Sequence, residues 1–146
     1  MHVRQATAND LPQIMELERD SPTAAHWSSA HYEAIFAAEE GSRLLLVIED
    51  QSVAGLLIAQ DVAGEWEIQN VLVARELQGR GLASQLLRTF LDMVSQSGTK
   101  SIFLEVRKSN QAARAFYEKW GFIQTGYRSR YYRDPLEDAV LYKLLS

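Results

Sequence analysis

The 146-residue chain contains no cysteine, only three prolines and no long apolar run. The absence of cysteine excludes a disulfide framework, a thiol nucleophile and a thiolate metal site. A membrane span needs roughly 18 consecutive apolar residues, which no segment approaches. Residues 1–10 also lack the apolar core of a signal peptide. We therefore expect a cytoplasmic protein with no membrane partner.

The sequence also lacks the residue spacing of several common site types. Its three histidines, His2, His26 and His31, form no carboxylate–histidine cluster with metal-ligand spacing, so we expect no metal. No Ser-His-Asp arrangement is legible. The net charge of −4 shows no basic excess of the kind that nucleic-acid binders carry, and we expect no nucleic-acid partner.

Charge is distributed unevenly along the chain. Residues 1–99 carry 6 basic and 14 acidic side chains, whereas residues 100–146 carry 9 basic and 5 acidic ones. An acidic surface beside a basic one would suit an anionic ligand on one side and a cationic ligand on the other. Uneven scatter of solvated charges explains the same counts, so the asymmetry decides nothing alone.

What the sequence does contain is the pattern of one folded domain, residues 1–146. The 47% apolar and 23% charged composition is ordinary for a globular protein, and this length normally makes a single domain. Helical apolar spacing and β-rich runs alternate along the chain without repeats. They predict strands over 2–7, 43–50, 52–62, 65–74, 100–107, 122–133 and 138–145, and helices over 9–20 (N-cap Asn9 or Asp10), from Ser28 or Ser29 onward, from Leu82 to a C-cap at Gly98, and over 110–120.

The order of these elements limits the fold. The three strands between residues 43 and 74 are joined by short polar turns, which favours an antiparallel meander. The strand over 100–107 follows a helix, and such a crossover favours a parallel pair with the strand before that helix. The predicted class is therefore α/β (α+β), with a parallel pair inside a mixed sheet.

The turn before the third helix is rich in glycine: Gln78-Gly79-Arg80-Gly81-Leu82-Ala83. A helix N-terminus offers unpaired backbone N–H groups and a partial positive charge, and glycines let a phosphate oxygen approach them. The pattern is neither a Walker loop nor a dinucleotide fingerprint, because it lacks Gly-Lys-Ser/Thr and the third glycine. Taken alone, an ordinary glycine turn explains it as well.

Longer motifs give the turn a context. The Q-x-x-G-x-A pattern at 78–83, "LEVRKSNQAARAFYEKWGF" at 104–122 and "YRSRYYRDPLEDAVLY" at 127–142 resemble the GNAT acyltransferases, and among them the RimI family of ribosomal-protein alanine N-acetyltransferases. The chain departs from that family at Thr23-Ala24-Ala25, before His26-Trp27, and at Val140-Leu141-Tyr142, where the family has a methionine. The first departure lies in a region that helps to shape the family's acceptor pocket.

The resemblance implies a fold, a cofactor and a partner. The fold is the GNAT fold, a mostly antiparallel seven-stranded sheet with a central parallel pair and four flanking helices. The cofactor is acetyl-CoA, and the acceptor is a protein N-terminal α-amine, specifically the N-terminal alanine of the eighteenth small-subunit ribosomal protein. The chain itself would be a monomer or weak dimer. Two alternatives remain open: a GNAT enzyme that acetylates a small-molecule amine or lysine, and a non-catalytic acetyl-CoA-binding interaction domain.

The resemblance also assigns residues to the cofactor. The glycine turn would present backbone amides to the diphosphate, and the preceding strand would run beside the pantetheine arm. Asn110, at the start of a helix, would contact the pantetheine or simply cap the helix. The implied cofactor-binding residues are Val71, Leu72, Val73, Gln78, Gly79, Arg80, Gly81, Leu82, Ala83, Ser84, Asn110, Ala113 and Tyr117.

Transfer to an amine needs a base, because the amine must lose its proton before it attacks; its pKa is about 8 for an α-amine and about 10.4 for lysine. Strand alternation puts Glu105 on the face opposite Leu104, in a strand where an unpaired charge is costly. The resemblance gives Glu105 the role of base. Glu67 is the rival, at the position other GNAT enzymes use, and a structural salt bridge is the alternative for both.

The remaining roles follow from the same resemblance. Tyr117 would protonate the departing thiolate, unless it is an ordinary packed aromatic. Backbone N–H groups near Leu72 or Val73 are the expected donors to the developing negative charge on the carbonyl oxygen. Arg107 is expected to position neighbouring backbone or a phosphate. The expected acceptor-binding residues are His26, Trp27, Asn70, Tyr131 and Tyr132.

Overall fold

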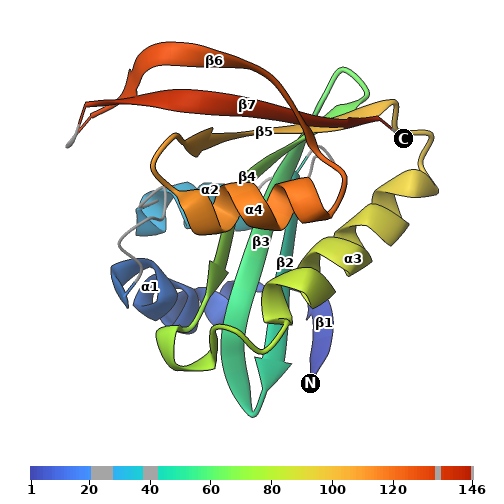
Figure 1. The fold of residues 1–146 in the computed structure, drawn as a ribbon. Coiled ribbons are helices and arrows are strands. Elements are labelled where there is room, and N and C mark those ends of the chain that lie inside the picture. The colour runs from blue at the N-terminus through green and yellow to red at the C-terminus, as the bar shows by residue number, and fades with distance from the viewer. Residues whose placement is uncertain (21–27, 38–42, 134–135, 146) are drawn as a thin grey trace.

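The computed structural model describes residues 1–20, 28–37, 43–133 and 136–145, and within them every predicted strand and helix is present (Figure 1). Two short 3-10 helices, Ala8–Asp10 and Arg75–Leu77, are additional. None of the described helices is long and apolar enough to cross a membrane. The strands are β1 (His2–Gln5), β2 (Arg43–Asp50), β3 (Ser52–Val62), β4 (Glu65–Val73), β5 (Ser101–Arg107), β6 (Ile123–Tyr132) and β7 (Glu137–Leu145), and the helices are α1 (Leu11–Asp20), α2 (Ser29–Ala37), α3 (Leu82–Ser95) and α4 (Gln111–Lys119).

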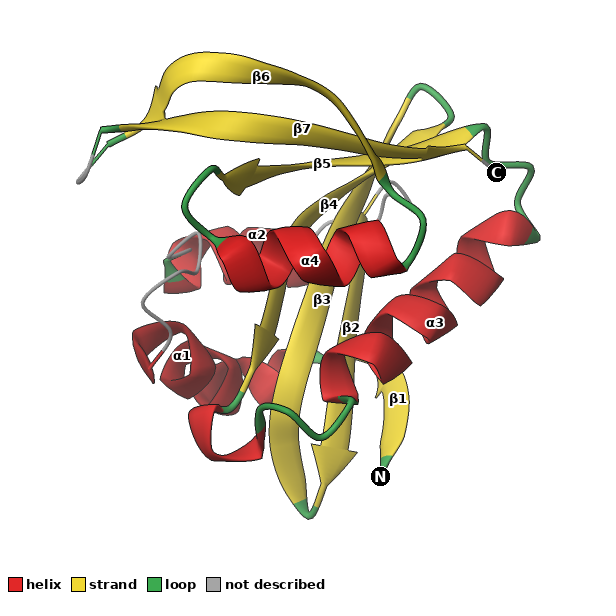
Figure 2. Cartoon of the chain, in the orientation of Figure 1, coloured by secondary structure: helices red, strands yellow, loops and turns green. Residues whose placement is uncertain are grey.

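The described strands form one seven-stranded sheet in the order β1-β2-β3-β4-β5-β7-β6. Every neighbouring pair is antiparallel except β4–β5, which is parallel because α3 carries the chain back between them. The predicted mixed sheet is therefore confirmed. The sheet twists so strongly that β6 and β7 run across the direction of β2 and β3 (Figure 2).

The two faces of the sheet are covered by different helix pairs. On one face the apolar stripes of α3 and α4 pack on the sheet, with Leu86, Leu87 and Phe90 fully buried. Full burial of a side chain of this size contributes about 1.5–3 kcal/mol. On the other face, Ile14 of α1 and Tyr32 of α2 pack on β2, β3 and β4. We call these the α3/α4 face and the α1/α2 face.

The parallel pair separates halfway along its length. Residues 65–68 of β4 pair with residues 101–104 of β5, and beyond this point the two strands have no register with each other. A bulge lies at the same place: Ile68 pairs with Ala59 and Asn70 with Ile58, which leaves Gln69 as an extra residue. A bulge bends its strand and shifts the face on which side chains lie. The sheet is thus opened between β4 and β5, on the α4 side of the molecule.

The helix ends agree with the sequence in part. Ser28 Oγ accepts from the His31 N–H at 3.3 Å, and Asn110 Oδ1 accepts from the Ala113 N–H at 3.1 Å, as predicted for N-caps. Two predictions are wrong by a few residues. The 3-10 helix before α1 moves the first N-cap from Asn9 or Asp10 to Thr7, and α3 ends with Gln96 as C-cap, two residues before Gly98.

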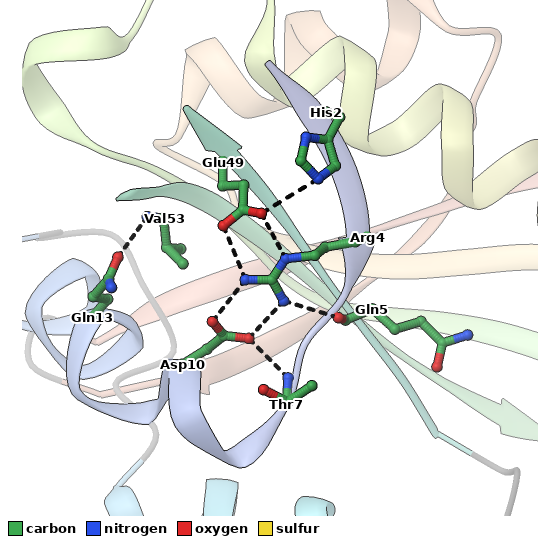
Figure 3. Close-up of polar contacts among 8 residues, drawn as sticks. All are labelled: His2, Arg4, Gln5, Thr7, Asp10, Gln13, Glu49 and Val53. Atoms are coloured by element: carbon green, nitrogen blue, oxygen red, sulfur yellow. Dashed lines mark hydrogen bonds and ion pairs between the residues drawn. The ribbon is translucent and has the colours of Figure 1, made fainter. Parts of the chain in front are cut away.

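A charged cluster fastens the first strand to the sheet (Figure 3). The Arg4 guanidinium binds both carboxylate oxygens of Asp10, at 2.8 and 2.9 Å, and both of Glu49, at 2.9 and 3.0 Å. Asp10 also accepts from the Thr7 N–H at 2.8 Å. Hydrogen bonding to Arg4 lowers the pKa of both carboxyl groups and raises that of Arg4. The cluster therefore stabilises β1 and the start of α1 as ion pairs.

Candidate functional site

A cavity of about 450 Å³ lies on the α3/α4 face, where β4 has left β5. The second half of β4 forms one wall, the turn before α3 forms another, and α4 closes the third side. The wall is apolar along β4 and α4 and exposes backbone along the turn. The lining residues are Val71, Val73, Leu77, Gln78, Gly79, Gly81, Leu82, Ala83, Ser84, Asn110, Ala112, Ala113, Phe116 and Tyr117.

Nearly all predicted cofactor-binding residues line this cavity. The exceptions are Arg80, which is exposed, and Leu72, whose side chain is buried on the α1/α2 face. Three lining residues were missed: Leu77, Ala112 and Phe116. Ala112 and Phe116 belong to the same apolar stripe of α4 as Tyr117, so the helical spacing contained the signal for them.

The turn needs glycine for conformation and leaves space where side chains would be. Gly79 and Gly81 have φ values of +82° and +80°, a left-handed region that other residues rarely adopt. A Cβ built on either glycine meets no atom within 4 Å, and both residues line the cavity. A side chain at either position would therefore enter open space beside the turn.

The start of α3 is suited to an anion. Gly81 is the N-cap and has no side chain to accept from the first turn, and its carbonyl accepts the Gln85 N–H at 3.1 Å. The N–H groups of residues 82–84 precede that first intrahelical bond and face the turn. The helix is 14 residues long, so its dipole adds a partial positive charge here. Backbone donors and a glycine turn together form a phosphate-binding geometry.

The backbone of β4 offers further donors along the cavity. Ala74 donates its N–H to the Ala54 carbonyl of β3 at 2.8 Å. Because N–H direction alternates along a strand, Leu72 also points toward β3, while Val71 and Val73 point toward the side that β5 has vacated. Of the two predicted oxyanion donors, Val73 is therefore placed for the role and Leu72 is not. Val71, which the bulge brings to the cavity side, joins it.

Tyr117 lies near the C-terminal end of α4, between the cavity and the core. Its side chain is only 7% exposed and packs edge-on against Phe116 and Phe122, with ring centroids 5.2 and 5.4 Å apart. Burial raises the pKa of its hydroxyl well above the ordinary value, so the phenol is a proton-bearing donor at neutral pH. Tyr117 is therefore packed in the core and also lines the cavity. The sequence had left these two placements as alternatives.

Glu105 faces the other side of the sheet. Ile102 and Leu104 are buried in the α3/α4 core, so the alternation places Glu105 on the α1/α2 face, as predicted. Its carboxylate is 14% exposed and pairs with Arg128 of β6, with Nε 3.1 Å from Oε1. Hydrogen bonding to Glu105 also raises the pKa of Tyr131. Glu105 therefore takes part in a salt bridge, the alternative that the sequence left open, and its partner is Arg128.

Glu67 lies on the same face as Glu105 and belongs to a polar network. It pairs in register with Phe103 of β5 and Gln60 of β3. The bulge residue Gln69 donates from Nε2 to Gln60 Oε1 at 3.0 Å and to Glu67 Oε1 at 3.4 Å. Two carboxylates therefore lie on one face of the sheet, on the two strands that separate.

The predicted acceptor-binding residues are partly assembled around these carboxylates. Asn70 follows the bulge on the α1/α2 face, and its buried Nδ2 has no hydrogen-bond partner among the described residues. Tyr131 reaches Glu105, and Tyr132 lies under the Arg107 guanidinium at 4.5 Å. The predictions for His26 and Trp27 lie outside the described residues.

Arg107 has a positioning contact, in line with its expected role. It binds Glu137 at 3.4 Å and the Arg133 carbonyl at 3.2 Å, so it links the end of β5 to Arg133, directly after β6, and to the first residue of β7. Glu137 in turn accepts from the Ser109 N–H. Among the described residues, no group of three or more His, Asp or Glu side chains could hold a metal ion.

These features allow groups from both faces of the sheet to take part in one reaction between β4 and β5. On the α3/α4 face are an anion-binding turn, an apolar wall and the buried phenol of Tyr117. On the α1/α2 face are the carboxylates of Glu67 and Glu105. The N–H groups of Val71 and Val73 point toward the opening itself. A group held in the opening can therefore meet a base on one side and an acid on the other.

Comparisons with known proteins agree on acetyltransferases. The sequence profile of the acetyltransferase (GNAT) family matches residues 11–122. The ribosomal protein bS18-alanine N-acetyltransferase of Escherichia coli strain K12 is 34% identical over 139 residues, 92% of this chain and 90% of that protein. A crystal structure of the E. coli ribosomal-protein-S18-alanine N-acetyltransferase superposes with a TM-score of 0.86 at 29% identity, covering 99% of this chain and 92% of that one. A variant of a Vibrio cholerae spermidine N-acetyltransferase has the same TM-score at 22% identity, covering 99% and 95%, a likeness of fold alone.

Proposed function

Because the chain belongs to the acetyltransferase (GNAT) family, we propose that it transfers an acetyl group from acetyl-CoA directly to the N-terminal α-amine of a protein. The acceptor is a ribosomal protein that begins with alanine, and the reaction takes place in the cytoplasm. One observation carries the proposal: a cavity with a glycine turn at a helix N-terminus lies where β4 leaves β5, the two strands that carry Glu67 and Glu105.

The cavity fits acetyl-CoA in shape and chemistry. The open space beside Gly79 and Gly81 and the N–H groups that start α3 suit the diphosphate. The side chains of Val71 and Val73 suit a pantetheine arm, and their backbone groups suit its amides. Acetyl-CoA, when bound, supplies the acetyl group as a thioester. The chain's own residues would then have to bring in the amine, take up the two protons that its nitrogen loses, deliver one proton to the sulfur and stabilise one developing charge.

Glu105 is the proposed general base. An α-ammonium group has a pKa of about 8, so a carboxylate within reach of it, directly or through a water, suffices to carry the proton away. Glu105 comes directly after Leu104, the last residue of β5 that pairs with β4, whereas Glu67 lies within the part of β4 that pairs with β5 and accepts from Gln69. We assign Glu67 to electrostatic attraction of the cationic amine and Glu105 to proton transfer.

The other two requirements are met from the opposite side. The N–H groups of Val71 and Val73 donate to the carbonyl oxygen as negative charge develops on it. Tyr117 would donate its proton to the sulfur as the C–S bond breaks, and the second proton that the nitrogen loses would restore the phenol through water. Burial raises the pKa of that phenol, so it carries its proton at neutral pH.

The acceptor class rests on sequence likeness and on charge. The E. coli relative, 34% identical over most of both chains, is named for the alanine of ribosomal protein bS18. Two carboxylates on the acceptor face favour a cationic peptide N-terminus. A polyamine is cationic as well, and the spermidine enzyme shares the fold, so charge and fold do not separate these acceptors.

A competition between acceptors tests the proposal. Peptides beginning with Ala, Ser and Met are compared with spermidine and with a lysine peptide whose N-terminus is blocked, and kcat/KM is measured for each. We expect the Ala peptide to be preferred and its N-blocked form to be inert. A preference for lysine or spermidine would overturn the N-terminal assignment, and binding of acetyl-CoA without turnover of any amine would identify a non-catalytic domain.

A further inference from the structure

A cation already occupies the space beside the proposed base. The Arg128 Nε lies 3.1 Å from Glu105 Oε1, and the guanidinium carbon lies 5.3 Å from the centre of the Tyr131 ring. A carboxylate together with an aromatic face is the usual surrounding of a bound ammonium group. The arginine therefore marks a cation subsite at the atom that has to receive the amine's proton.

Arg128 reaches this subsite from the edge of the sheet. It pairs with Ala139 of β7, which pairs in turn with Arg107 of β5, so the three residues form one row across the strands. Ala139 is buried and small, and it leaves room for the arginine side chain to cross β7 toward Glu105. Arg107 is held by Glu137. Arg128 is thus the cation of this row that pairs with the base.

The surroundings of the Arg128–Glu105 ion pair allow another cation to replace the arginine. The side chain of Arg128 is 57% exposed while that of Glu105 is 14% exposed, so water surrounds the arginine but has little access to the carboxylate. Ion pairs with one partner in solvent are weak. The register of β6 is broken between Arg128 and Tyr132, and Arg130 has a φ of +52°. Backbone pairing with β7 is therefore interrupted immediately after Arg128, where the Arg130 N–H donates instead to the Asp138 side chain at 2.9 Å.

We propose that Arg128 competes with the acceptor for Glu105: it pairs with the carboxylate while the acceptor subsite is empty, and the incoming ammonium group displaces it. The inference rests on the proposed function, with Glu105 as base. The half-buried carboxylate of Glu105 is therefore paired with one cation or the other at each stage. Once the arginine has moved away, Glu105 is free to take the amine's proton. The competition raises the acceptor concentration needed to occupy the subsite, by the same factor for every acceptor.

Kinetics of Arg128→Gln test the competition. Removing the competitor lowers the acceptor KM, about three- to fivefold for an exposed pair, whereas kcat stays within about twofold because the arginine has already left Glu105 in the ternary complex. Arg130→Gln is the matched control, since it removes the same charge from the same strand. A raised or unchanged acceptor KM, a tenfold loss of kcat, or an equal fall of KM in Arg130→Gln would overturn the proposal.

A second measurement does not depend on turnover. In ¹⁵N-labelled protein the Arg128 Nε–H signal, assigned by its loss in Arg128→Gln, reports whether the guanidinium lies beside Glu105. Adding the acceptor peptide with desulfo-CoA should move that signal toward the position it has in Glu105→Gln, and an unchanged signal at saturating peptide contradicts displacement. The two hypotheses fail separately: a wild type that acetylates no peptide argues against the proposed function, whereas normal wild-type turnover with an unchanged acceptor KM in Arg128→Gln argues against Arg128 alone.

Discussion

Glu105 and Tyr117 lie on opposite faces of the sheet, at the place where β4 and β5 separate. Glu105 alternates with the core residues Leu104 and Val106, while Tyr117 packs among those core residues. Their separation by the sheet lets each act on a different atom of a group held in the opening.

The separation makes the base testable by a pair of variants. Glu105→Gln keeps the shape of the side chain and removes its basicity, so kcat should fall about 100-fold or more. Glu67→Gln should raise the acceptor KM with a smaller change in kcat, because Glu67 attracts the amine without taking its proton. Steady-state kinetics read both, with calorimetry to show that acetyl-CoA affinity is retained. A larger loss of kcat in Glu67→Gln would exchange the two roles.

The proposed acid predicts a loss of rate without a loss of fold. Tyr117→Phe retains the ring contacts with Phe116 and Phe122, so the melting temperature should change little, while kcat falls about 10- to 100-fold. Tyr127→Phe, at a tyrosine that is 67% exposed, is the control. Burial raises the pKa of Tyr117, so the wild-type rate should not decline through its ionisation below pH 10. A full-rate Tyr117→Phe enzyme would remove the assignment.

The phosphate turn predicts a change in binding that backbone strain cannot explain. Gly81 and Gly98 have φ values of +80° and +76°, and a Cβ on either meets no atom within 4 Å. Gly81→Ala and Gly98→Ala should therefore lose similar stability. Only Gly81→Ala places a methyl group in the cavity, and calorimetry should show about tenfold weaker acetyl-CoA binding, the loss of one charge-assisted hydrogen bond. Equal affinities in the two variants would argue against the turn as the diphosphate site.

The Arg4 cluster predicts how stability depends on pH. Pairing with Arg4 lowers the folded-state pKa of Asp10, so the pair stabilises the protein fully above the unfolded-state pKa, about 3.9, and the effect disappears as pH falls through the folded-state value. Asp10→Asn should cost about 1–2 kcal/mol at pH 7 and progressively less in acid. Urea unfolding at several pH values measures this, with the exposed Asp92→Asn as control. A difference that persists below pH 2 would contradict the ion-pair explanation.

The sequence predicted the elements well because each depends on local periodicity and on capping. The alternation of Glu105 with Leu104 and the stripe on α4 that carries Tyr117 are properties of a single strand and a single helix. The glycine turn was legible for the same reason, since its conformation and its openness both follow from the missing side chains.

What the sequence did not predict depends on pairing between distant strands. The bulge at Gln69 exists only relative to β3, and it decides that Val71 and not Leu72 turns its N–H toward the opening. Arg128 and Tyr131 are three residues apart, which a regular strand would place on opposite faces. The irregularity of β6 brings both to Glu105. The spacing of apolar and polar residues in the sequence does not predict that irregularity.

The most direct test of the central claim is a crystal structure of the chain with acetyl-CoA. The account predicts that the diphosphate binds the backbone N–H groups of residues 82–84. It also predicts that the thioester lies between β4 and β5, with its carbonyl toward Val71 or Val73 and its sulfur on the side of Tyr117. A diphosphate bound elsewhere, or a thioester outside the opening, would contradict it.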